Sequence, residues 1–149
     1  MTEISFYHLT VRPLEWALPK LLERTFESGV RALVVVSSEA RVEELNAHLW
    51  TYGANAWLPH GAEKDDNAAD QPIWLNATGK NANAADFLFL ADGAVNDHVE
   101  DFTRVFELFD GRDGEAVAAA RERWKVYRAA GHDLSYWQQD ERGRWSKAA

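Results

Sequence analysis

The sequence lacks cysteine altogether, and none of its apolar runs approaches the length of a membrane span. The absence of cysteine excludes disulfides, thiolate metal ligands and cysteine nucleophiles, and it is typical of a reducing cytoplasm. The first ten residues also lack the basic and apolar segments of a signal peptide. We therefore expect a cytoplasmic protein that has no membrane partner.

Positive charge is scarce. Sixteen Lys and Arg residues stand against 24 Asp and Glu residues, which gives a formal net charge of −8. Broad binding of duplex DNA requires many phosphate contacts from Lys and Arg, so this balance argues against it.

The motifs that carry common chemistries are missing as well. The apolar run at 32–36 leads into Ser37 and Ser38 without a phosphate-binding glycine pattern and without a nucleophile-elbow sequence. The five His residues are scattered, and no two have the helical spacing of metal ligands. We expect no catalytic residue, no metal site and no cofactor.

The apolar pattern predicts one α/β domain over residues 1–149. Continuous or bulky apolar segments predict strands at 4–9, 32–36, 72–75, 87–90 and 102–109, and 3-4 spacing predicts helices at 14–28, 39–52 and 115–130. Pro19 lies inside the first helical pattern, so that helix is expected to begin either at Leu14 or at Pro19. Alternating strands and helices favour a three-layer Rossmann-like fold, with a mostly parallel mixed sheet flanked by helices. Residues 132–149 are expected to form a small hairpin or an extended tail.

The last long helix has an unusual edge. On a helical wheel Val117 and Trp124 lie at the seam of the apolar stripe, and the cations Arg121, Lys125 and Arg128 occupy the adjacent stripe. One interpretation is the solvated flank of an ordinary amphipathic helix. The other is a site for an acidic ligand, because three cations beside a large aromatic are conspicuous on an acidic chain.

Tryptophan is abundant, with seven residues in 149. Trp50 lies near the end of the second predicted helix, and Trp57 lies in the loop that follows. They either close the edge of the sheet or form a protein–protein hot spot, in which Trp is enriched.

Several segments together resemble a known family, the chi subunit of bacterial DNA polymerase III holoenzyme. The resemblance is carried by FYHL, LWTYGANAWLPHG, QPIWL, FLFLADG, FELFDG and ARERWKVYRAAGHDL. It extends over nearly the whole chain and is most specific at 49–61 and 120–131. It implies a single α/β domain that is not an enzyme.

The resemblance also implies two partners. One is the psi subunit, through which chi joins the clamp-loader assembly. The other is single-stranded-DNA-binding protein, whose acidic C-terminal tail ends in Phe and a free carboxylate, so that contact with DNA is indirect. The residues expected to hold the tail are Arg121, Trp124, Lys125, Arg128, Val117 and Phe109. The residues expected to form the psi-binding surface are Trp50, Trp57, Leu58, Pro59 and His60.

Two rival functions remain open at the level of sequence. The first is a small hydrolase or nucleotide-binding enzyme, which a Rossmann-like sheet can support. The second is direct binding of single-stranded DNA, with aromatic side chains stacked on bases.

Overall fold

The computed structural model describes residues 2–53, 58–62, 65 and 67–149. Its strands are β1 (Glu3–Leu9), β2 (Ala32–Val35), β3 (Gly61–Ala62), β4 (Ile73–Asn76), β5 (Phe87–Ala91), β6 (Arg104–Asp110), β7 (Asp133–Gln139) and β8 (Trp145–Lys147). Its α-helices are α1 (Leu14–Glu27), α2 (Glu39–Thr51) and α3 (Gly114–Ala129), and short 3-10 turns occur at Ala68–Asp70 and Val99–Asp101. Across the described residues, no helix has both the length and the apolar character that a membrane span requires.

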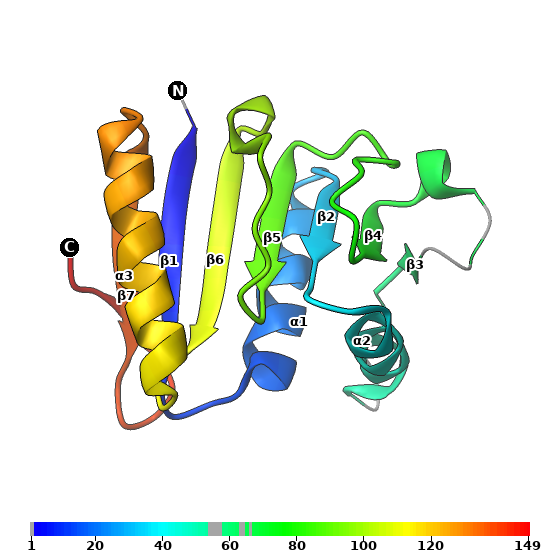
Figure 1. The fold of residues 1–149 in the computed structure, drawn as a ribbon. Coiled ribbons are helices and arrows are strands. Elements are labelled where there is room, and N and C mark those ends of the chain that lie inside the picture. Colours follow the sequence, from blue (N-terminus) through cyan, green and yellow to red (C-terminus); the bar gives the residue numbers. More distant parts are fainter. Residues whose placement is uncertain (1, 54–57, 63–64, 66) are drawn as a thin grey trace.

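The strands form one eight-stranded sheet in the order β3-β4-β2-β5-β6-β1-β7-β8 (Figure 1). All neighbouring pairs are parallel except β7 and β8, which are antiparallel. The predicted three-layer fold with a mostly parallel mixed sheet is confirmed. The end of the chain is both more regular and more central than expected, because β7 joins the sheet alongside β1 before the hairpin to β8 begins.

Helices cover the two faces of the sheet unequally. Helix α3 lies in front of β1 and β7 in Figure 1, whereas α1 and α2 lie on the opposite side, behind β5 and beside β4. Successive side chains of a strand point to opposite faces of the sheet, so each strand contributes to the hydrophobic cores on both sides. In β1, Ile4 and Phe6 point into the α3-side core, and Tyr7 and Leu9 point into the α1-side core.

Local sequence signals set the ends of the helices. Ser38 caps α2 by accepting a hydrogen bond from the Arg41 N–H, and Asp113 caps α3 by accepting one from the Glu115 N–H. Gly131, at φ 86°, ends α3 in the left-handed conformation that glycine tolerates best. Helix α1 begins at Leu14, so Pro19 lies inside it. Of the two starts expected from the sequence, the later one was wrong.

The connections around β1 and β6 create a crevice. These strands are neighbours, yet β1 leads into α1 on one face and β6 leads into α3 on the other. In open α/β sheets such a switch point leaves space outside the carboxyl ends of the strands, where ligands commonly bind.

Candidate functional site

A groove runs beside α3, between the helix and strand β7. It encloses about 680 Å³. Its lining residues are Ala118, Ala120, Arg121, Glu122, Trp124, Lys125, Arg128, Tyr136 and Ala149. We call it the α3 groove. It brings together four of the six residues that the sequence assigned to an acidic-ligand site.

Trp124 is the large apolar wall of the α3 groove. Its side chain is half-buried and packs edge-on against the Phe6 ring, with the centroids 5.3 Å apart. On its other side it meets the Tyr136 ring at 5.9 Å, again edge-on. The indole is therefore held in place by the core and still presents surface to the groove.

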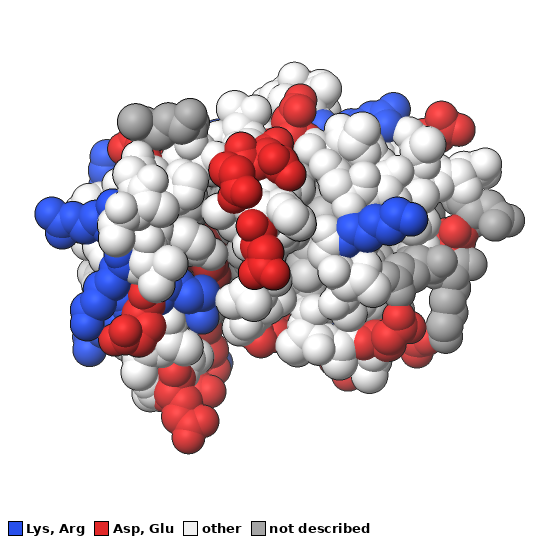
Figure 2. Space-filling model, turned by 45° about the horizontal axis from the view of Figure 1, so that its top comes forward, with Lys and Arg blue, Asp and Glu red and all other residues white. Residues whose placement is uncertain are grey.

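The cations of the groove come from one helix edge. Arg121, Lys125 and Arg128 are exposed, and only Lys125 has a close carboxylate, that of Glu122 at 3.2 Å, within the part of the chain that the structure describes. In the view of Figure 2, Lys and Arg gather mainly on the left, where α3 lies, and Asp and Glu dominate the centre. Burial raises the pKa of the Tyr136 hydroxyl, and the charge of Arg121 works against that increase. The groove is thus a local cationic site on an acidic protein.

Two of the expected residues lie outside this groove. Phe109 is only 4% exposed and packs against the rings of Phe6, His8 and Tyr136, so it supports the site from within the core. Val117 is half-buried against the α3-side core and does not line the groove. The helical wheel placed Val117 near Trp124, and Phe109 was expected from the strand that precedes the helix, but neither expectation included the packing that turns both side chains toward the core.

Tyr136, which was not expected at this site, forms the opposite wall of the groove. It lies on β7, a strand that was expected only as a hairpin or tail. The signal was present in DLSYWQQ, where Leu134 and Tyr136 alternate with Ser135 and Trp137. Recognition of that alternation as a strand would have placed Leu134 and Tyr136 on one face of it, but only the pairing of β7 with β1 brings Tyr136 beside Phe6.

The residues expected to form the psi-binding surface differ in how far they are exposed. Trp50 is 55% exposed, and its ring lies 4.3 Å from the ring of His60. His60 and Leu58 are buried, with 4% and 1% exposure, and Pro59 is half-buried. The ring nitrogens of His60 lie 2.7 Å from the Leu58 carbonyl oxygen and 3.2 Å from that of Asn46. The buried His60 therefore supports the Trp50 ring, and the burial of both Leu58 and His60 corrects their expected place on the surface. Trp57 lies outside the described residues.

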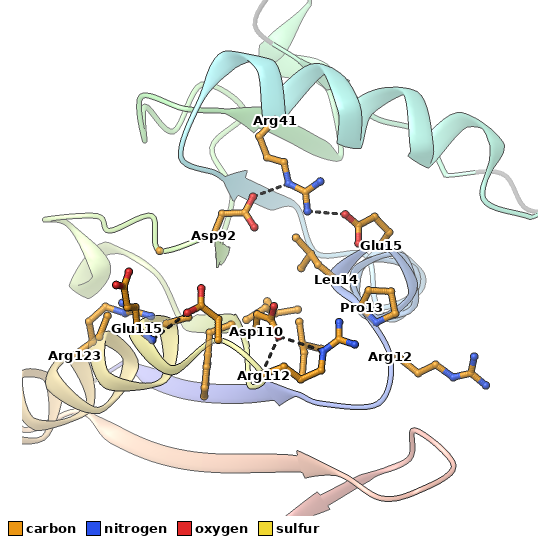
Figure 3. Close-up of a pocket in the computed structure, with 17 residues that line it drawn as sticks. Arg12, Pro13, Leu14, Glu15, Arg41, Asp92, Asp110, Arg112, Glu115 and Arg123 are labelled. Atoms are coloured by element: carbon orange, nitrogen blue, oxygen red, sulfur yellow. Dashed lines mark hydrogen bonds and ion pairs between the residues drawn. The ribbon is translucent and has the colours of Figure 1, made fainter.

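A second cavity, of about 700 Å³, occupies the crevice at the carboxyl ends of β1 and β6 (Figure 3). Arg41 closes one side by bonding the carboxylates of Glu15 at 2.6 Å and Asp92 at 2.7 Å, and Glu44 lies 3.1 Å away. Although burial disfavours its charge, the hydrogen bonds to Asp92 and Glu15 raise the pKa of Arg41. This guanidinium is thus committed to joining α1, α2 and the loop after β5.

The fourth cation of α3, Arg123, turns into this second cavity. Its Nε donates to Glu107 Oε2 at 2.9 Å, and the Tyr127 hydroxyl donates to the same oxygen at 3.0 Å. Burial raises the pKa of Glu107, against the influence of Arg123 and Tyr127. Arg123 is therefore occupied by an internal carboxylate and takes no part in the α3 groove.

The loop between β1 and α1 contains a cradle of three backbone N–H groups, arranged as in an anion-binding site. The side chain of Gln139 already occupies it. The backbone N–H groups of Thr10, Val11 and Arg12 all donate to Gln139 Oε1, at 3.0, 2.9 and 3.0 Å. Successive N–H groups that converge in this way bind phosphate in many nucleotide-binding folds. Here the side-chain amide of β7 occupies the position.

The charges around the second cavity are also unsuitable for a nucleotide. Its lining includes four arginines, of which Arg41, Arg112 and Arg123 pair with carboxylates of the chain, and five carboxylates: Glu15, Asp92, Asp110, Asp113 and Glu115. Among the described residues, no cluster of three or more His, Asp or Glu side chains is placed to hold a metal ion. These features disfavour the nucleotide-binding alternative.

Comparison with known proteins gives a consistent result. Residues 1–135 match the family model described as DNA polymerase III chi subunit, HolC. The chain is 30% identical to DNA polymerase III subunit chi of Haemophilus influenzae over 135 residues, which cover 88% of this chain and 93% of that protein. It is 28% identical to DNA polymerase III subunit chi of Pseudomonas aeruginosa over 137 residues, with 90% and 94% coverage. A probable subunit chi of Rickettsia prowazekii is 29% identical over 110 residues, with 72% and 67% coverage.

Proposed function

Because the chain belongs to the family of DNA polymerase III chi subunits, we propose that it links the clamp loader to single-stranded-DNA-binding protein. The chi subunit is a non-catalytic accessory subunit in DNA replication. The proposed link has one surface for each partner. The α3 groove takes the acidic C-terminal tail of single-stranded-DNA-binding protein, and the surface around Trp50 takes the psi subunit or an equivalent clamp-loader component.

One observation supports the tail site above all others. Arg121, Lys125 and Arg128 line the same groove as the half-buried ring of Trp124. A tail of acidic residues that ends in Phe and a carboxylate needs both features. The cations attract the acidic residues and the terminal carboxylate, and the apolar wall formed by Trp124 and Tyr136 covers the Phe ring.

The expected energies predict weak binding of each single tail. Exposed ion pairs contribute about 0–1 kcal/mol each and weaken as salt is added. Burial of one Phe side chain contributes roughly 1.5–3 kcal/mol. Many tails on one coated strand then strengthen attachment through avidity. Contact with DNA is indirect in this mechanism, and the protein works in the cytoplasm as part of the nucleoid-associated replisome.

The surface around Trp50 supports the second partner. A Trp that is more than half exposed, and whose ring rests on the buried imidazole of His60, has the character of an interface anchor. It lies on α2, whereas the tail groove lies on α3 at the opposite end of the sheet (Figure 1). This separation allows both partners to bind at the same time.

The direct test is titration of the protein with an acidic peptide that ends in Phe, monitored by tryptophan fluorescence. Arg121→Ala is expected to weaken binding about 2- to 5-fold, the loss of one exposed ion pair. Trp124→Ala is expected to weaken it roughly 10-fold or more, because the apolar wall is lost. Arg112→Ala is the matched control, since Arg112 is exposed but lines the other cavity.

Thermal unfolding must accompany the titration, because the Trp124 ring also packs on Phe6. Arg121→Glu provides a second variant that leaves this packing intact. If the wild type, Arg121→Glu and Trp124→Ala bind the peptide equally well, the α3 groove is not the tail site.

A further inference from the structure

The α1-side surface of β1, β7 and β8 has no helix across it in the described structure. Helix α1 packs on β2 and β6, and α2 packs on β3 and β4. In Figure 1 both helices lie away from β1 and β7, whose other face carries α3. We call this uncovered surface, together with the adjoining edge of α1, the open face.

Aromatic side chains fill the open face in place of a helix. Trp16, Trp137 and Trp145 are half-buried and pack against the α1-side core. The ring of Tyr7 stacks on that of Trp137, with an interplanar angle of 12°, and meets the edge of Trp145 at 4.8 Å. The rings are thus fixed from below and remain partly accessible from solvent.

Cations accompany these rings. Arg12 and Lys20 lie over the ring of Trp16, at 5.3 and 4.9 Å from its centroid. Arg12 extends away from the second cavity in Figure 3, toward the turn before β8, where its Cγ lies close to Gly143. Arg104 lies over Phe106 at 4.5 Å. Cations stacked on rings in this way present both charge and flat apolar surface.

Two further cations complete the set. Arg24 follows Lys20 by four residues on α1, and its charge, with that of Arg104, lowers the pKa of the Tyr7 hydroxyl against the increase caused by burial. Lys147 is the cross-strand partner of Trp137 and therefore emerges on the same face. In the described part of the chain, no carboxylate lies within ion-pair distance of Arg12, Lys20, Arg24 or Lys147.

The local charge is opposite to that of the whole protein. The open face carries the cations Arg12, Lys20, Arg24, Arg104 and Lys147 and the carboxylates Glu3, Glu27 and Asp133. Glu23, at the border of the same stripe of α1, accepts a hydrogen bond from the Tyr52 hydroxyl. Glu3 is 3.7 Å from Arg104. The net charge of −8 that argued against broad binding of duplex DNA is a sum over the entire surface, and it does not describe this face.

We propose that the open face binds single-stranded DNA directly, with bases against its aromatic rings and phosphates along its cations. Proteins that bind single strands without sequence preference combine these two features. Trp16, Lys20 and Arg24 follow one another along α1 at four-residue spacing. This row is about 12 Å long by helical rise, which is enough for a few nucleotides. This site is separate from the α3 groove and does not depend on the proposed tail binding.

The test is fluorescence anisotropy of a labelled oligothymidylate with the intact protein. Binding is expected to be saturable at low salt and to weaken about 20-fold between roughly 50 and 200 mM salt if three phosphates are neutralised. Lys20→Glu is expected to weaken it at least about 5-fold by the same charge mechanism. Lys80→Glu makes the same charge change on the loop after β4 and should leave the affinity within about twofold.

Base stacking is tested with a second probe and a second variant. An abasic oligomer of equal length should bind roughly 10-fold more weakly than the oligothymidylate, since the stacking contribution is lost. Trp145→Leu, on the short edge strand β8, should reduce this preference, whereas Arg121→Ala should not.

Three results would overturn the proposal. One is the absence of saturable oligonucleotide binding at low salt. Another is an equal response to Lys20→Glu and Lys80→Glu. The third combines two observations: the wild type binds no oligonucleotide, and the Lys20→Glu variant loses a protein partner in pull-downs. The open face would then be a protein interface.

Discussion

The imidazole of His48 compensates for Pro19. Pro19 has no N–H to donate to the carbonyl of Glu15, four residues earlier in α1. His48 Nε2 lies 2.6 Å from that oxygen and reaches it from α2. A proline in the interior of a helix is thereby accommodated, and the two helices on this face of the sheet are joined at the same point.

This relationship predicts a coupling between two substitutions. His48→Ala should destabilise the protein by about 1–3 kcal/mol, because a part-buried carbonyl loses its donor. In a Pro19→Ala background the helical N–H is restored, so the same substitution should cost less. Urea unfolding of the wild type, both single variants and the double variant measures the difference. Strict additivity would show that His48 stabilises the protein in some other way.

The ion pairs of Arg41 predict a dependence of stability on acid. Partial burial would raise the pKa of Glu15, but hydrogen bonds from its own backbone and from Arg41 outweigh this and lower it below the ordinary 4.5. The folded state therefore binds this proton less readily than the unfolded state does. The resulting stabilisation is present above about pH 4.5 and is lost as the pH falls through the lowered pKa.

Glu15→Gln should remove this part of the acid sensitivity, as measured by thermal unfolding at a series of pH values. Glu44→Gln is the control, since Glu44 contacts the same guanidinium from a side chain that is 67% exposed. If the unfolding curves of Glu15→Gln and the wild type respond identically to acid, the Arg41–Glu15 pair contributes nothing measurable.

The filled cradle at Gln139 predicts opposite effects for two substitutions. Gln139→Ala should lower the free energy of unfolding by about 1–3 kcal/mol, because three backbone donors lose their common acceptor. Gln139→Glu places a carboxylate among the same donors and removes the Nε2 group, which is buried without a partner in the described structure. Three N–H donors favour the charged form, so the pKa of the new carboxyl should be lowered.

The Gln139→Glu variant should therefore be at least as stable as the wild type at neutral pH and should lose that advantage in acid, below about pH 4.3. Denaturant unfolding at neutral and acid pH would reveal this. If Gln139→Glu is less stable at neutral pH than in acid, the three N–H groups of the cradle do not stabilise an anion.

The two proposed partner surfaces predict separable defects. Trp50→Ala should impair capture of clamp-loader subunits from cell extract and leave binding of the acidic peptide unchanged. Arg121→Ala should do the reverse, because the two residues lie on different helices at opposite ends of the sheet (Figure 1). Arg121 is exposed, so its substitution is expected to change stability by no more than about 0.5 kcal/mol. Trp50→Ala also removes the packing on His60, so thermal unfolding must accompany its pull-down. The two-surface mechanism is wrong if each variant loses both activities.

The sequence by itself determined the three helices, the strands β1, β2, β4, β5 and β6, and the cationic edge of α3. Apolar periodicity, cap residues such as Ser38 and a helix-ending Gly131 act over a few residues, so they can be recognised without the fold. The same is true of Arg121, Lys125 and Arg128, whose common edge follows from helical spacing alone. The resemblance in the segments around these residues identified the family, which the comparisons then confirmed.

Only the tertiary structure decided which distant residues complete each site. Tyr136 faces Trp124 because β7 pairs with β1, and Phe109 is excluded from the groove because its strand lies beneath the helix. The buried state of Leu58 and His60, the engagement of Arg123 by Glu107, and the filling of the first loop by Gln139 all follow from contacts between segments far apart in the chain. Such contacts depend on strand order and register, which no local pattern specifies.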